Sequence, residues 1–178
     1  MGLVGLVGLV GLVGLVGVNK SVGKAEESPA TQLAGFIAKF DPAIAKLARA
    51  GRRELRKRFP TAIELVYDNY NALAIGYAST ERVSDVFVSL AVYATGINLY
   101  FYYGRSLPDP EKLLLGGGSQ GAFIRFENVA MLARPAVAAL LRAAVAEGDT
   151  PLPATGRGYT VIKSISAKQR PRRPRARS

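Results

Sequence analysis

The spacing of apolar residues changes near residue 61, from helical spacing before it to an alternation with a period of two after it. This alternation is typical of β-strands with one buried face, and it constrains the fold more than any other feature. The first alternating stretch, ELVYDNYNALAIGY at residues 64–77, is interrupted by polar residues in its middle. The second, at residues 86–102, is interrupted at residues 94–96. Each stretch is therefore predicted to form a β-hairpin.

The pairing of the first hairpin is predicted by matching apolar residues across it. If Leu65 faces the helices, its apolar partner is Leu73. Ile63 then pairs with Ile75. This register leaves residues 68–70 as a three-residue loop, in which Asp and Asn tolerate the unusual backbone angles of a tight turn.

The opposite face of the first hairpin would carry Glu64 beside a row of small residues. This row contains Ala72, Ala74 and Gly76. One interpretation is that the small residues let another element pack closely. The other is a groove with Glu64 at its floor, and its rim would consist of Tyr67, Tyr70 and Asn71.

The second hairpin keeps one face apolar when Val92 pairs with Ile97. The same register pairs Leu90 with Leu99, Val88 with Phe101, Phe87 with Tyr102 and Ser89 with Tyr100. The sheet is therefore predicted to have an aliphatic side that faces the helices and an aromatic, polar side. Aromatic faces can stack ligands or bases, but Tyr is also common at half-wet surfaces, and both interpretations stay open.

Helices are indicated where Pro stands at a first turn before apolar residues at helical spacing. The first begins at residues 28–29, the second runs from residues 41–42 to about Phe59, and the last runs from Pro135 to Gly148. One face of the second helix is basic, and it is either solvated or binds phosphate. This face consists of Lys46, Arg49, Arg52, Arg53 and Arg56.

Residues 107–128, LPDPEKLLLGGGSQGAFIRFEN, predict a turn, a short helical piece, a glycine stretch and a strand at about residues 122–127. The glycines at 116, 118 and 121 have the spacing of a dinucleotide-binding loop. Such a loop must lead into a helix, whereas a strand follows here, so we reject the match. A further edge strand is predicted at residues 159–165.

The net charge of +11 is unevenly distributed along the chain. Residues 1–29 are neutral overall, residues 30–147 carry +4 and residues 148–178 carry +7, so the folded part is only mildly basic. We expect a low-complexity extension and linker at residues 1–27, an α+β domain at residues 28–148 and a C-terminal segment at residues 149–178.

The N-terminal extension repeats Gly-Leu-Val five times. A period of three suits neither a strand nor a helix, and the apolar run of about 17 residues is at the short limit for a membrane span. We expect an extension without a folding role. Membrane association through residues 2–18 is the alternative to a cytoplasmic protein.

The C-terminal stretch SISAKQRPRRPRARS is expected to be extended, solvated and disordered, because it cannot bury apolar area. It either aids solubility alone or contacts phosphates and acidic partners without reading sequence. Its basic residues are Lys168, Arg170, Arg172, Arg173, Arg175 and Arg177.

The chain contains no His and no Cys. This composition removes disulfides, the usual general base, thiolate nucleophiles and the commonest transition-metal ligands. We therefore predict no catalytic residue, no metal and no cofactor. An enzyme with Glu64 or Asp68 as general base and a Tyr as acid is a weak alternative.

The stretches YDNYNALAIGY, GINLYFYYG, LPDPEKLLLGGG, IRF and SISAKQRPRRP stand in this order along the chain. Together they resemble the YdhG-like family, a bacterial domain of unknown function, over roughly residues 33–173. The resemblance implies an α+β fold. We expect a single antiparallel sheet of about five or six strands with helices packed on one face.

Part of this family has been linked to a frataxin-like iron chaperone role, which would require clustered carboxylates or His. Here the early helix is rich in Arg and His is absent, so this role is disfavoured. In relatives the glycine stretch often reads G-S-G-K-x-x-R, whereas Ser119 and Ala122 stand at the Lys and Arg positions of this chain.

The predicted function is a non-catalytic binding module for a small ligand or a protein segment. The predicted ligand-binding residues are Glu64, Tyr67, Tyr70, Asn71, Tyr100 and Tyr102. The alternative is a nucleic-acid-associated protein, in which the basic tail and the Arg-rich helix contact phosphates and the tyrosines stack bases.

Overall fold

The computed structural model of the chain describes residues 26–174, so the Gly-Leu-Val repeat, Arg175 and Arg177 lie outside the described residues. Within the described part, the fold is α+β, with three α-helices and one open six-stranded sheet. The elements are α1 (Pro29–Ala38), α2 (Pro42–Arg58), β1 (Ile63–Asp68), β2 (Leu73–Ala78), the short 3-10 helix η1 (Val83–Asp85), β3 (Val86–Tyr93), β4 (Gly96–Phe101), β5 (Ala122–Arg125), η2 (Val129–Ala133), α3 (Pro135–Ala146) and β6 (Thr160–Ile165). The predicted fold class is confirmed.

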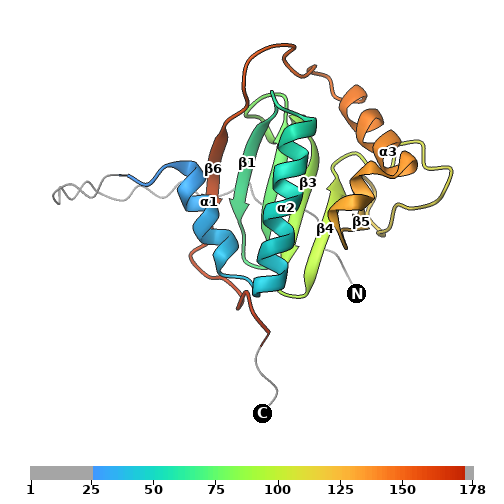
Figure 1. Cartoon of the computed structure of the whole chain (residues 1–178). Helices are drawn as coiled ribbons and strands as arrows, with labels where there is room; N and C mark the ends of the chain where they lie inside the picture. The colour runs from blue at the N-terminus through green and yellow to red at the C-terminus, as the bar shows by residue number, and fades with distance from the viewer. Residues whose placement is uncertain (1–25, 175–178) are drawn as a thin grey trace.

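The strands lie in the order β5-β4-β3-β2-β1-β6. All neighbouring pairs are antiparallel except β1 and β6, which are parallel. The last strand therefore brings the C-terminal part of the chain to the edge of the sheet beside β1. Helices α1 and α2 lie over one face of the sheet, α2 runs along the strands over its middle, and α3 lies toward the end with β4 and β5 (Figure 1).

The first two helices begin as their capping residues predict. The side chain of Ser28 accepts a hydrogen bond from the Thr31 amide at 3.2 Å, and that of Asp41 accepts one from the Ala43 amide at 3.0 Å. Helix α2 approaches the core closely at Gly51, where a Cβ atom would lie 2.7 Å from the ring of Phe126.

The predicted register of the second hairpin is confirmed. Val92 pairs with Ile97, and the pairing of Ser89 with Tyr100 follows from the same register. Phe87 does not lie on the aromatic side, because the pairing of β2 with β3 is irregular at this point. Its ring packs edge-to-face on Phe59 at the end of α2, with 5.0 Å between the ring centroids.

The predicted register of the first hairpin is wrong. Leu65 pairs with Gly76 instead of Leu73, and residues 69–72 form the turn, in which the Asn69 amide donates to the Ala72 carbonyl at 2.9 Å. A shift by an odd number of residues exchanges the two faces of a strand. Leu65 consequently packs in the cluster on the side away from the helices, whereas Val66 belongs to the core beneath them.

The prediction of a short helical piece within residues 107–121 is also wrong, because these residues form no helix. The carboxylate of Asp109 accepts hydrogen bonds from the amides of Leu113 and Leu114 at 3.0 and 2.8 Å. These bonds satisfy two backbone N–H groups in a turn instead of a helix. Leu115 then pairs with Phe123 in an isolated bridge.

Candidate functional site

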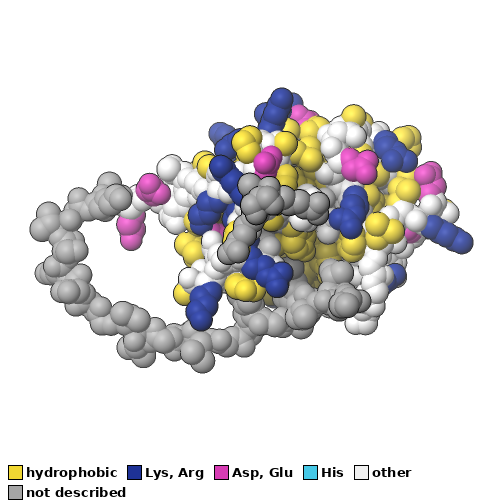
Figure 2. Space-filling model, turned by 90° about the horizontal axis from the view of Figure 1, so that it is seen from below, with side chains coloured by type: hydrophobic (Ala, Val, Ile, Leu, Met, Phe, Trp, Pro, Cys, Tyr) yellow, Lys and Arg dark blue, Asp and Glu magenta, His cyan; other side chains and the backbone are white. Residues whose placement is uncertain are grey.

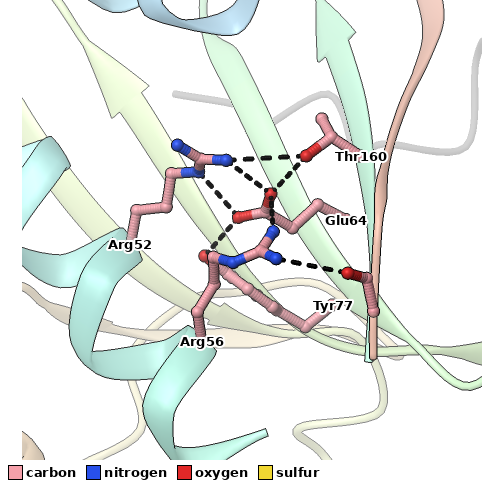
Figure 3. A network of polar contacts seen from close by, with 6 residues as sticks. Arg52, Arg56, Glu64, Tyr77 and Thr160 are labelled. Carbon is pink, nitrogen blue, oxygen red and sulfur yellow. Dashed lines mark hydrogen bonds and ion pairs between the residues drawn. The ribbon is translucent and has the colours of Figure 1, made fainter. Parts of the chain in front are cut away.

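Glu64 lies on β1 with its side chain toward α2, and the residue is fully buried. Its carboxylate accepts hydrogen bonds from Arg52 Nε and Nη2, both at 2.8 Å, and from Arg56 Nη1 at 2.7 Å. The hydroxyls of Thr160 and Tyr77 donate at 2.7 and 3.3 Å (Figure 3). Four elements, α2, β1, β2 and β6, therefore meet at one carboxylate.

This network keeps Glu64 ionised. Burial alone would favour the neutral acid, but the hydrogen bonds and charges of Arg52, Thr160 and Arg56 outweigh it, so the pKa of Glu64 is lowered. Burial and the nearby Glu64 charge raise the pKa of Tyr77 well above its usual value, so its phenol stays protonated. A carboxylate has about four acceptor sites, which these donors fill, and Glu64 is left without capacity for a ligand.

Asp68 is a second buried acid on the helix-facing side, and it is the last residue of β1 rather than part of the turn. It forms ion pairs with Arg172 Nη2 at 2.7 Å and with Lys39 Nζ at 3.1 Å. Arg172 is only 6% exposed, so the expectation of a solvated tail is wrong for this residue.

The C-terminal clasp, by which we mean residues 166–174, holds the end of the sheet. The amides of Ser166 and Arg170 donate to the carbonyls of Asp68 and Tyr70, each at 2.9 Å. Arg173 donates to backbone carbonyls at the end of α1, with 3.2 Å to that of Phe40. Lys168 and Arg170 stay exposed. In the view of this end, basic and acidic side chains are interspersed (Figure 2).

The structure distributes the six predicted ligand-binding residues over three places. Tyr67, Tyr100 and Tyr102 lie partly buried on the side away from the helices, and Tyr67 and Tyr102 pack on the Leu65 cluster. Tyr70 and Asn71 are exposed in the β1–β2 turn, and Arg170 lies over the ring of Tyr70. Glu64 and the three tyrosines are on opposite faces of one sheet, so the predicted shared groove is wrong. Ligand binding by the tyrosines stays a prediction.

A different groove lies directly outside Glu64, between α2, the start of α1 and residues 156–160. It is open and has a volume of about 1000 Å³. Six cationic residues line it, and among the described residues that line it there is no Asp or Glu. The six are Arg49, Arg52, Arg53, Arg56, Lys57 and Arg157.

Gly158 fixes the position of residues 156–160, which form the wall of the groove opposite α2. The Gly158 amide donates to the Pro60 carbonyl at 2.8 Å, and a Cβ atom at Gly158 would lie 1.8 Å from the Ala62 carbonyl oxygen. Arg56 Nη2 donates to the Gly158 carbonyl at 3.2 Å. The wall is thereby held against both the start of β1 and helix α2.

The cations of α2 form two rows with different partners. Arg52 and Arg56 are bound to Glu64 beneath the groove. Arg49, Arg53 and Lys57, which we call the outer row, are exposed and follow one another four residues apart. Of these, Lys57 pairs with Glu54, and neither Arg49 nor Arg53 has an ion-pair partner within residues 26–174.

Sequence reasoning identified the basic face of α2 but not the groove. The missing wall comes from residues 156–160, about a hundred residues further along the chain. The usable signal was the pair Arg52 and Arg56, one helical turn apart, beside a strand that carries Glu64.

Comparison of the chain with protein-family models, curated proteins and solved structures gave no match in any of the three. Between residues 26 and 174, none of the helices is long and apolar enough to cross a membrane. The same residues contain no group of three or more Asp and Glu side chains that could hold a metal ion.

Proposed function

We propose that the chain is a non-catalytic binding module, and that the groove between α2 and residues 156–160 binds the phosphate groups of its ligand. The observation that carries the proposal is the lining of the groove, which has six cationic side chains and no acid among the described residues. Guanidinium groups suit phosphate because they donate two parallel hydrogen bonds to its oxygens.

The charge balance supports an anionic ligand. Glu64 offsets only part of the charge of Arg52 and Arg56, and the outer row adds three further cations next to them, of which Lys57 is paired with Glu54. Like charges held close together on one helix repel one another. An anion bound between them would relieve this repulsion and would add charge-assisted hydrogen bonds.

The buried network gives the groove a fixed floor. Because Glu64 holds Arg52 and Arg56 in place, their remaining N–H groups stand at set positions, and less side-chain entropy is lost when a ligand binds. The C-terminal tail is a less suitable phosphate-binding site, because Arg172 and Arg173 already donate hydrogen bonds to backbone carbonyls of the fold.

The proposal is tested by calorimetric titration of the full chain with inorganic tripolyphosphate. Replacing both Arg49 and Arg53 with Gln should weaken binding at least about tenfold, since one hydrogen bond between charged groups contributes about 1.5–3 kcal/mol. The matched control replaces the exposed Arg125 and Arg142 with Gln, which removes the same net charge from residues that do not line the groove. Absence of binding, or equal weakening by both double variants, would refute the proposal.

A further inference from the structure

We infer that residues 156–174, which we call the C-terminal strap, open and close as one unit, and that an anion in the groove holds the strap closed. The strap consists of the groove wall, β6 and the C-terminal clasp. The inference rests on the proposed function, because it concerns the regulation of the same groove. It follows from where the strap is attached to the rest of the fold and from how little of it is buried.

The strap is attached by polar contacts near both of its ends. Glu64 and Asp68 are buried acids of β1, four residues apart, and each has a partner on the strap. Near one end the Thr160 hydroxyl donates to Glu64 at 2.7 Å. Near the other end Arg172 pairs with Asp68, also at 2.7 Å. One strand of the sheet thus holds both the groove wall and the clasp.

Between these contacts the strap is weakly attached. β6 is an edge strand that pairs with β1 alone, and the pairing is parallel and interrupted by an irregularity between Val66 and Tyr67 (Figure 1). Each of the other strands described above contains buried residues, whereas β6 contains none. In the whole strap only Gly158 and Arg172 are buried, one toward each end. A segment with so few buried contacts opens at a lower free energy than the core.

The clasp and the groove wall are expected to open together. When Arg172 leaves, Asp68 keeps only Lys39 among its described ion-pair partners, and the side chain of Lys39 is 43% exposed. Release of the clasp alone therefore leaves a buried acid poorly compensated. Once this cost is met, opening of β6 adds little further cost and gains chain entropy. The opening consequently extends to Gly158.

Opening of the strap dismantles the groove. The groove loses the cation of Arg157. Arg56 loses the Gly158 carbonyl, to which it donates at 3.2 Å. An anion that contacts both walls therefore binds only when the strap is closed, and by mass action its binding stabilises the closed state. The coupling is reciprocal, so release of the clasp weakens anion binding in the groove.

Hydrogen exchange of the full chain, followed by NMR, tests the inference. Three amides report on the strap, because each donates to a backbone carbonyl outside it, and they belong to Gly158, Ser166 and Arg170. All three should have the same opening equilibrium constant and should exchange faster than the amide of the fully buried Leu90 on β3. Inorganic tripolyphosphate at about a hundred times its dissociation constant should slow the exchange of all three by about a hundredfold.

A variant tests the coupling from the clasp. Arg172→Gln removes a partner of Asp68 and lies outside the groove. It should speed up exchange of the Gly158 amide by about a hundredfold or more, the effect of removing one partner of a buried ion pair, and that of Ser166 by the same factor. The matched control, Arg125→Gln on β5, removes one exposed cation and should leave both rates unchanged. If Arg172→Gln does not fold, exchange in the parent chain decides.

The possible failures are distinguishable. If calorimetry shows that tripolyphosphate binds but the strap amides exchange at an unchanged rate, this inference is overturned and the proposed function stands. Strap amides that exchange as slowly as that of Leu90, or slowing confined to Gly158, overturn it as well. So does a folded Arg172→Gln chain with an unchanged rate at Gly158. If tripolyphosphate does not bind, both proposals fail.

Discussion

Replacing Glu64 with Gln should destabilise the fold strongly, although the change keeps the shape of the side chain. The substitution removes the counter-ion of two guanidiniums and places an amide donor against their N–H groups. Removal of one partner from a buried ion pair typically costs about 3–5 kcal/mol. The side chains of Arg52 and Arg56 are 23% and 29% exposed, so water can solvate them in part. We therefore expect a loss of about 3 kcal/mol, at the lower end of that range.

Urea unfolding followed by circular dichroism at neutral pH measures this loss. The control is Glu54→Gln, which removes the partly exposed partner of the exposed Lys57 and should cost less than about 1 kcal/mol. The pKa of Glu64 is lowered in the folded state, so its contribution is complete above the unfolded pKa of about 4.3 and is lost as the pH falls through the folded value. The difference between the parent chain and the variant should be constant from about pH 5 to 8 and should shrink below about pH 4. A loss no larger than that of the control would refute the view that this buried network stabilises the fold.

The clasp and the groove wall allow two further tests of stability. Deleting residues 166–178 should lower the free energy of unfolding by about 3 kcal/mol or more, because Asp68 loses its buried partner Arg172, whereas deleting residues 175–178 should leave it unchanged. Equal unfolding curves for the two truncations would contradict the role of the clasp. Gly158→Ala should cost at least about 1–3 kcal/mol, because its Cβ would collide with the Ala62 carbonyl, and Gly117→Ala, with nothing within 4 Å, is the control. A stable Gly158→Ala chain would show that this wall is not held where we place it.

Much of the fold could be predicted because local signals and burial agree there. Ser28 and Asp41 are good capping residues, and both helices begin where they predict. In the second hairpin every residue on the helix-facing side is apolar, so matching apolar partners such as Val92 and Ile97 gave the correct register. In this hairpin the pattern of apolar and polar residues is sufficient to predict the strand register.

The first hairpin could not be predicted in this way, because Glu64 and Asp68 occupy its buried, helix-facing side. A pattern of apolar and polar residues assigns acids to the solvent side of a strand. This assignment placed Leu65 toward the helices and Glu64 away from them, so the two faces of β1 were exchanged. The acids can be buried because Arg52 and Arg56 neutralise Glu64, and Arg172 and Lys39 neutralise Asp68. Arg172 is 104 residues from Asp68, so the pairing depends on tertiary structure.

The candidate site was missed for a related reason. The Arg residues of α2 form a groove only together with residues 156–160, which β6 carries to the edge of the sheet beside β1. The parallel pairing of β6 with β1 has no short-range signal, since it connects segments that are about a hundred residues apart.

The central claim is the position of the anion site, and an NMR titration tests it most directly. Inorganic tripolyphosphate is added to the ¹⁵N-labelled full chain, and the backbone amide and arginine Nε–Hε signals are followed. We predict that the signals of Arg49, Arg53 and Arg157 shift first and saturate together. Shifts confined to the aromatic side of the sheet around Tyr100, shifts confined to residues 166–178, or no shifts at all would contradict the account.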